Sequence, residues 1–214
     1  MVLAVLTIIV GSFGGLEQKK LKSLLAYSSI SHMGYTLIAF STGTFNGMQI
    51  LFCYLFLYML AGLCIWSIFL VLELKYKYVK KQNKDLADLK LLSKSNSMLA
   101  LFFSTVLLSI AGIPPMIGFL VKIGIFLASI EASMHFIAII SILCSVISTF
   151  YYIRIVKIMY FESSIVGKLY YPIKSNISIL LVCLFYFLLF LFVNPTLIYL
   201  FSYKITLLLT MVIV

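Results

Sequence analysis

The sequence predicts an all-α polytopic membrane protein of about six transmembrane helices, the fourth of them discontinuous. Three observations support this fold class: the composition, the length of the apolar runs, and two prolines inside one run. Of 214 residues, 64% are hydrophobic and 10% are charged, which is more apolar surface than a soluble domain can bury. The runs are continuous rather than alternating, and this favours helices over a barrel of strands.

Six apolar stretches approach or exceed the roughly 20 residues that a helix needs to cross a hydrocarbon core. They cover roughly 1–16, 23–41, 48–72, 97–130, 136–160 and 176–201. The first stretch has neither a basic n-region nor a small-residue cleavage site, so we interpret it as a span and not as a signal peptide. We expect residues 1–214 to form a single membrane domain.

The basic residues alternate between the two sides of the predicted membrane. Fourteen of the sixteen lysines and arginines lie around the connectors after the first, third and fifth stretches, and connector 73–96 alone has seven. Only Lys204 lies on the opposite side. This positive-inside pattern predicts that both termini lie outside, and it accounts for the net charge of +10 without nucleic acid. Connector 73–96 is either a solvated loop or a contact for anionic lipids or partner subunits.

The fourth stretch is too long for one straight span. As a single helix, residues 97–130 would extend about 51 Å at 1.5 Å per residue, against a core of roughly 30 Å. The candidate break residues are Gly112, Pro114, Pro115 and Gly118. Each proline removes a backbone donor and clashes with the preceding turn. We therefore expect half-helices at about 97–110 and 119–130, joined by irregular backbone near 111–118 that protein or a hydrated cavity surrounds.

Lys122 follows this break and is the one basic residue far from the end of a stretch. It lies about 12 Å from the outer end, farther than a lysine stem can snorkel. A charge at mid-membrane costs about 2.5–3.5 kcal/mol, and burial disfavours the ammonium form. A lysine that can lose and regain its proton beside a hydrated break is a candidate proton relay; the alternative is a structural or snorkelling lysine.

The second stretch contains a polar face within "AYSSISHMGYT". Its residues are Ser28, Ser31, His32, Tyr35 and Thr36, which recur at helical spacing. The small hydroxyl residues are typical of helix–helix packing. His32 is a second, weaker candidate for a proton relay, because imidazole titrates near neutrality when hydrated.

The sequence predicts no metal site and no cofactor-binding site in this chain. Its four cysteines are scattered through apolar stretches without the spacing of zinc or iron–sulfur ligands, so we expect them to be small buried residues. Glu17 is expected to pair with the neighbouring lysines at the surface. Glu131 and His135 are expected to be solvated, with a proton exit as the alternative role.

Two motifs resemble a known family. "GSFGGLEQKKLKSLLAYSSISHMGY" (11–35) and "AGIPPMIGFLVK" (111–122) are similar to the subunit 2 family of the NADH dehydrogenase of respiratory complex I. "STFYYIRIVKIMY" (148–160) resembles the helix that follows in that family. The resemblance implies the C-terminal part of an antiporter-like subunit fold. It further implies that Lys122 ends the proton pathway and that His32 belongs to a central polar axis.

The resemblance also implies a function, partners and a location. The chain would be a proton-translocating subunit of NADH:ubiquinone oxidoreductase, an enzyme complex that uses NADH, FMN, iron–sulfur clusters and ubiquinone elsewhere, so this chain would hold no redox site. Its partners would be other complex I membrane subunits and membrane lipids. The abundance of lysine over arginine is typical of an AT-rich organelle genome. We therefore expect the mitochondrial inner membrane, with basic connectors on the matrix side and both termini on the intermembrane-space side.

One feature of the family has no counterpart here. Members carry a further half upstream, with its own broken helix and charged residues, whereas this chain begins at Met1 where the second half begins. We expect a split gene whose N-terminal half is a separate chain. Two other functions stay open: a subunit of a stand-alone cation/proton antiporter, and a degenerate scaffold half-subunit through which no proton passes.

Overall fold

The computed structural model describes residues 1–77, 86–90, 92–162 and 175–213. Its secondary structure in these ranges is helical. The helices are α1 (Val2–Leu16), α2 (Leu21–Ser41), α3 (Phe45–Lys77), the 3-10 helix η1 (Leu86–Leu89), α4 (Leu92–Ser95), α5 (Ser97–Ala111), α6 (Ile117–Glu131), α7 (His135–Phe161), α8 (Ser175–Val193) and α9 (Thr196–Ile213).

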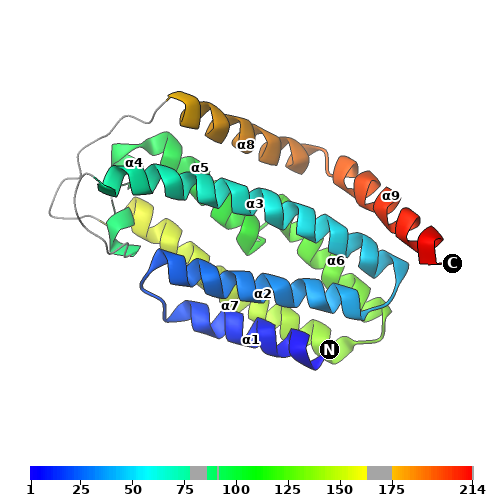
Figure 1. The fold of residues 1–214 in the computed structure, drawn as a ribbon. Helices are drawn as coiled ribbons and strands as arrows, with labels where there is room; N and C mark the ends of the chain where they lie inside the picture. The colour runs from blue at the N-terminus through cyan, green and yellow to red at the C-terminus, as the bar shows by residue number, and fades with distance from the viewer. Residues whose placement is uncertain (78–85, 91, 163–174, 214) are drawn as a thin grey trace.

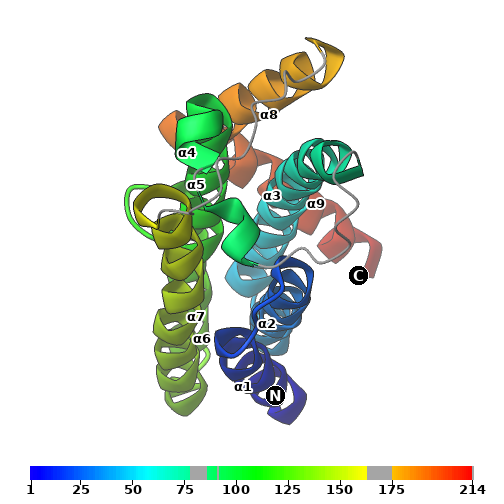
Figure 2. The same ribbon diagram turned by 90° about the vertical axis from the view of Figure 1, so that its left-hand side faces the viewer.

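The long helices form a bundle around α3. Helix α3 contacts α2, α5, α6, α8 and α9, while α1 contacts α2 and α7. Helices α1 and α8 lie on opposite sides of the bundle (Figure 1 and Figure 2). Both termini lie at the same end of the bundle, the right-hand end of Figure 1, and α2 begins and α7 ends at the other.

Small residues bring α1 and α2 together. A Cβ added to Gly11 would meet the backbone nitrogen of Ser31 at 2.5 Å, and one added to Gly34 would collide with Ile8. The two helices can therefore pack closely only because these positions lack side chains. This contact explains the expected packing role of the small residues in the second stretch.

The fourth apolar stretch is discontinuous, as predicted. Helix α5 ends at Ala111 and α6 begins at Ile117. Gly112 has a φ of 78° and caps α5, and its N–H donates to the carbonyls of Leu108 and Ser109, both at 3.1 Å. A left-handed residue of this kind ends many helices, and the prolines that follow cannot continue the hydrogen-bond ladder.

Gly118 lies inside α6 rather than in the break. It occupies the first turn of α6, where an added Cβ would collide with the carbonyl oxygen of Ser109. Its role is therefore to let the first turn of α6 approach the last turn of α5. The expected start of the second half-helix at residue 119 was two residues late.

The last apolar stretch differs from the expected single span over 176–201. The structure has two helices there, α8 and α9, bent by 83° at Asn194 and Pro195. Pro195 lacks an N–H and suits the first turn of a new helix, and its carbonyl accepts from the N–H of Ile198 at 3.2 Å. Lys204, expected after the last span, lies within α9 on an exposed side.

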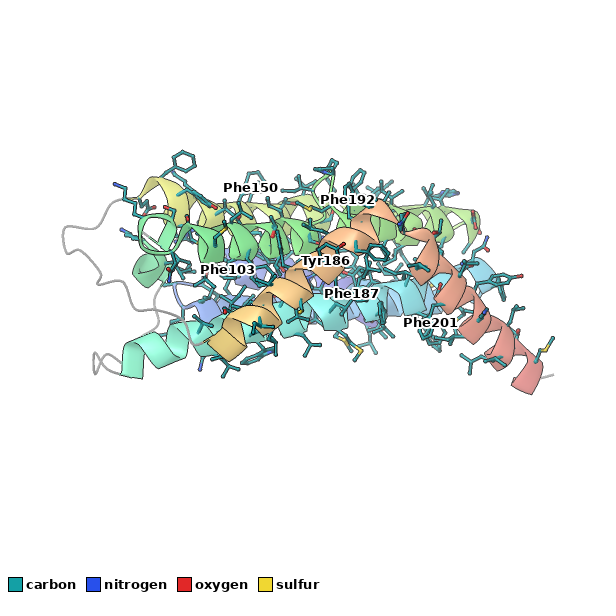
Figure 3. All side chains as sticks on the ribbon, turned by 90° about the horizontal axis from the view of Figure 1, so that it is seen from above. Phe103, Phe150, Tyr186, Phe187, Phe192 and Phe201 are labelled. Atoms are coloured by element: carbon teal, nitrogen blue, oxygen red, sulfur yellow. The ribbon has the colours of Figure 1, made fainter. Side chains whose placement is uncertain are left out.

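Helix α8 crosses the bundle diagonally when seen from above, and α9 continues beyond it (Figure 3). The rings of Phe102 and Phe185 join α5 to α8 at 5.3 Å. The Cys53 thiol joins α3 to α9 by donating to the Ser202 hydroxyl at 3.0 Å. These contacts place α8 and α9 on α3 and α5.

The described part of connector 73–96 is helical and packed, in contrast to a solvated loop. Helix α3 continues to Lys77, and Leu86, Leu89 and Leu92 are buried in the core. The Leu86 N–H donates to the Lys19 carbonyl at 2.9 Å. The leucines of this connector are spaced three apart, so they bury one edge against the end of the bundle. Residues 78–85 lie outside the described residues.

Two helices within the described ranges are long and apolar enough to cross a membrane, and the bent pair α8–α9 would make a third. The two are the segment Phe45–Val71 of α3 and helix α7. Helices α1 and α5 are apolar but shorter, at 15 residues each. The count of six spans therefore stays a prediction.

Candidate functional site: a buried lysine beside a helix break

Lys122 lies in the second turn of α6, directly beside the break, and only 4% of it is exposed. Its Nζ donates a hydrogen bond of 2.7 Å to the carbonyl of Ala111, the last residue of α5. The same nitrogen lies 5.5 Å from the centre of the Tyr35 ring on α2. A backbone carbonyl and an aromatic face therefore replace water around this side chain.

The geometry of the break favours a cation at this point. The last carbonyls of a helix have no partner within the helix and carry partial negative charge. A cation at such an end is stabilised by about 0.3–1 kcal/mol, and by up to ~2 kcal/mol where it is partly buried. An aromatic face adds a further attraction for a desolvated cation. These contacts offset part of the penalty of burying the ammonium group.

Gly112 makes room for the lysine. A Cβ added there would lie 2.8 Å from the Lys122 Cδ and 3.3 Å from Nζ. The positive φ of Gly112 and the absence of a side chain thus let Lys122 reach the end of α5. Pro114 and Pro115 lie farther along the break and are joined by a cis peptide bond.

A small cavity lies beside Lys122. It offers about 40 Å³ to the centres of water molecules, and one water needs about 10–15 Å³ on this measure, so about three waters fit. Its polar lining residues are His32, Tyr54, Tyr58, Ser109 and Lys122. Most of the remaining lining is aliphatic and includes Leu188 from α8. The cavity therefore brings the two predicted relay residues, Lys122 and His32, to one space.

His32 is buried and hydrogen-bonded at both ring nitrogens. Its Nδ1 lies 2.6 Å from the Tyr54 hydroxyl on α3, and its Nε2 lies 3.2 Å from the Tyr152 hydroxyl on α7. The Tyr58 ring packs on the imidazole with a centroid distance of 5.0 Å. Three tyrosines from two other helices thus hold the histidine of α2.

The polar face predicted on α2 is buried throughout. Its residues have exposed fractions of 8% or less: Ser28, Ser31, His32, Tyr35 and Thr36. The two serine hydroxyls and the threonine hydroxyl donate to carbonyls three residues earlier in their own helix. The Tyr35 hydroxyl instead donates to the Ser141 carbonyl on α7 at 3.3 Å. Of this face, only His32 lines the cavity.

The remaining candidate polar residues lie away from the cavity. Glu17, Glu131 and His135 are exposed, and Glu131 accepts a hydrogen bond from the Asn46 amide at 3.3 Å. Cys183 is exposed as well, so the expectation of a buried residue is wrong for this cysteine. Among the described residues, no group of three or more His, Cys, Asp or Glu side chains is arranged to hold a metal ion.

Tyr54 and Tyr152 could not be identified as site residues from the sequence. Each lies in a long apolar helix, where a tyrosine is an ordinary packing residue. Tyr54 and Tyr58 are one turn apart on α3, and Tyr151 and Tyr152 are adjacent on α7. Such spacing describes one helix at a time and does not identify the histidine that a tyrosine faces on another helix.

The helices, the apolar spans and the break between α5 and α6 form the fold of an antiporter-like membrane subunit. Residues 1–148 match the model of the family described as "NADH:quinone oxidoreductase/Mrp antiporter, TM". The chain belongs to this family. The resemblance of residues 11–35 and 111–122 to complex I sequences is thereby confirmed.

Curated relatives extend over nearly the whole chain. The chain is 40% identical over 205 residues to "NADH-ubiquinone oxidoreductase chain 2" of Marchantia polymorpha, covering 95% of this chain and 40% of that protein. It is 35% identical over 193 residues to "NADH-quinone oxidoreductase subunit N" of Parvibaculum lavamentivorans, covering 90% of this chain and 39% of that protein. The chain thus spans about two fifths of the length of these relatives.

Solved structures share the fold. A chain of respiratory complex I from Thermus thermophilus superposes with a TM-score of 0.76 at 28% identity, covering 92% of this chain and 44% of that one. A chain of the Mrp complex from Dietzia sp. superposes with a TM-score of 0.82 at 18% identity, covering 96% of this chain and 46% of that one. At that identity the second likeness concerns the fold alone.

Proposed function

We propose that this chain is a proton-translocating membrane subunit of an NADH:quinone oxidoreductase, in which Lys122 carries the proton. The observation behind this proposal is the burial of Lys122 at a helix break, beside a small cavity that His32 also lines. The names of the curated relatives support the choice of complex. Redox chemistry would take place in other subunits, which hold the NADH, FMN, iron–sulfur and quinone sites.

In this mechanism Lys122 alternates between two protonation states. The protonated form is held by the Ala111 carbonyl, the C-terminal end of α5 and the Tyr35 ring. The neutral form is favoured by burial, because desolvation penalises the charged amine. Charges on neighbouring chains would shift the balance between the two states, and water in the cavity would deliver or remove the proton.

We propose the following setting for the chain. It forms a single membrane domain in the mitochondrial inner membrane, next to other complex I membrane subunits and lipids. The end of the bundle where α2 begins and α7 ends carries Lys19, Lys20 and Lys157, and we call it the basic end. This end would face the matrix, and the end with both termini would face the intermembrane space, in agreement with the positive-inside rule.

A cation/proton antiporter subunit is the second candidate. It is supported by the family description, which names the Mrp antiporter beside NADH:quinone oxidoreductase, and by the shared fold of the Mrp complex chain. A scaffold half-subunit is the third candidate, and it would tolerate the loss of the Lys122 ammonium group without any change in proton transfer.

The test is gentle detergent purification followed by mass spectrometry of this chain and everything that accompanies it. Complex I predicts iron–sulfur and flavoprotein subunits together with a second hydrophobic chain that carries another broken helix. Recovery of antiporter-type membrane chains alone would favour the second candidate. The intact mass of the purified chain shows independently whether the segment equivalent to the remaining three fifths of the relatives belongs to the same polypeptide.

A further inference from the structure

Two tyrosine hydroxyls bracket His32 in a continuous polar chain. The Tyr54 hydroxyl lies 2.6 Å from Nδ1 and the Tyr152 hydroxyl lies 3.2 Å from Nε2. All three side chains are buried, with exposed fractions of 6% for Tyr54, 5% for His32 and 0% for Tyr152. Because α2, α3 and α7 each contribute one member, this chain crosses the bundle from one helix to the next.

The chemistry of a neutral imidazole gives this chain a direction. One ring nitrogen donates and the other accepts, so the two hydroxyls must take opposite roles. In one arrangement Tyr54 donates to Nδ1 while the N–H at Nε2 donates to Tyr152. In the other arrangement Tyr152 donates to Nε2 while the N–H at Nδ1 donates to Tyr54.

Conversion of the first arrangement into the second moves one proton. The Tyr54 hydroxyl passes its proton to Nδ1 and takes the proton that the Lys122 ammonium group releases into the shared cavity. At the same time Nε2 passes its proton to the Tyr152 oxygen, which releases its own hydrogen toward the adjacent Tyr151, and Lys122 is left neutral. No electron moves, and the ring stays neutral before and after the transfer.

The two ends of the chain lie in different surroundings. Tyr54 lines the cavity that also contains Lys122. Tyr152 packs against the Tyr151 ring at 4.5 Å, and the buried Tyr151 hydroxyl lies within reach of the Ser31, Ser148 and Tyr152 side chains.

Tyr151 leads away from Lys122. Its ring lies against Gly15, since a Cβ added to that glycine would be 2.9 Å from the Tyr151 Cε1. Gly15 is in the last turn of α1, close to the start of α2. Helix α2 begins at the end of the bundle opposite the termini (Figure 1), which is the end we propose faces the matrix.

We propose that Tyr54 and Tyr152 are proton-relay residues, and that the chain Tyr54–His32–Tyr152 connects the Lys122 cavity with Tyr151 and the basic end of the bundle. This inference rests on the proposed function and names the residues through which a proton reaches or leaves Lys122. Tyr160 provides the contrast, because it lies on α7 like Tyr152 but is 41% exposed and does not line the Lys122 cavity.

The test compares four variants in the assembled complex in sealed membrane vesicles: Tyr54→Phe, Tyr152→Phe, Tyr160→Phe and Lys122→Met. The readout is protons moved per electron, at equal amounts of assembled complex. We expect Tyr54→Phe and Tyr152→Phe to lose as much proton transfer as Lys122→Met, and Tyr160→Phe to match the unmodified protein.

The outcomes separate the inference from the function on which it rests. If Lys122→Met abolishes proton transfer while Tyr54→Phe and Tyr152→Phe behave like Tyr160→Phe, the relay is overturned and the proposed function stands. If Lys122→Met transfers protons normally, the proposed function falls and the relay falls with it.

A second substitution covers variants that fail to assemble. 3-Fluorotyrosine at position 54, 152 or 160 keeps the hydroxyl and its hydrogen bonds but makes it more acidic. The relay predicts a changed rate of proton transfer for positions 54 and 152 and an unchanged rate for position 160. Equal rates at all three positions would overturn it.

Discussion

The contacts of Lys122 explain how single residues allow a lysine inside an apolar bundle. The Ala111 carbonyl accepts its hydrogen bond, and the Tyr35 ring lies 5.5 Å away. Gly112 supplies the space, because its backbone faces the lysine stem where any other residue would place a side chain. The site therefore depends on Gly112 as much as on the lysine.

Replacing Gly112 with alanine tests this dependence. A left-handed backbone at φ 78° costs an L-residue roughly 1–2 kcal/mol, and the new Cβ would lie 2.8 Å from the Lys122 Cδ. We expect Gly112→Ala to lower both thermal stability and proton transfer. Gly43→Ala is the matched control, since Gly43 has a φ of 63° but nothing within 4 Å of an added Cβ.

The control separates backbone strain from displacement of the lysine. Gly43→Ala is expected to lower the melting temperature through strain alone and to leave proton transfer per assembled complex unchanged. A Gly112→Ala variant with normal proton transfer would contradict the proposed role of Gly112.

Among the helices, α5 with α6 and α8 with α9 show two consequences of proline. In the first pair the break encloses Lys122, whereas in the second the 83° bend directs α9 along α3. The break of the first pair could be predicted, because proline acts on its own turn and residues 97–130 were too long for one span. The same local signal, Asn194-Pro195, was present in the last stretch, but the apolar run through it suggested one continuous helix.

A disulfide between α3 and α9 tests the position of the bent helix. The Cys53 Sγ lies 3.0 Å from the Ser202 Oγ, so a sulfur in place of that oxygen would need to move by about 1 Å to reach the S–S length of about 2.05 Å. We expect Ser202→Cys to form a disulfide with Cys53 on mild oxidation. The measurement is the number of maleimide-reactive thiols in the denatured protein, which should fall by two.

The control for this experiment is Ser202→Cys combined with Cys53→Ser, which should retain all of its thiols. If the single variant also keeps every thiol reactive after oxidation, α9 does not lie on α3 as described.

For the whole molecule, the fold class could be predicted because hydrophobicity and length act over each segment separately. Contacts between distant segments could not be predicted in this way. Leu86, Leu89 and Leu92 belong to a basic connector, yet they are buried against the end of the bundle. Tyr54 and Tyr152 meet His32 only because three helices pack with a particular rotation, which depends on the whole core.

The orientation of the bundle is tested by labelling exposed residues at its two ends. We expect an impermeant maleimide to label Lys20→Cys only from the matrix side and Ser133→Cys only from the other side, because the basic residues gather at the first end. A Cys183→Ser background removes the exposed native thiol. Labelling of both positions from the same side would contradict the proposed topology.

The most direct test of the central claim is the proton-to-electron ratio of the assembled complex with Lys122→Met. This substitution keeps the length of the side chain and removes the ionisable group, while Lys204→Met removes an exposed lysine of α9 as a matched control. The account predicts a lower ratio for Lys122→Met and an unchanged ratio for Lys204→Met. An unchanged ratio for both, at normal levels of assembled complex, would contradict a proton-carrying role for Lys122 and leave the scaffold as the remaining function.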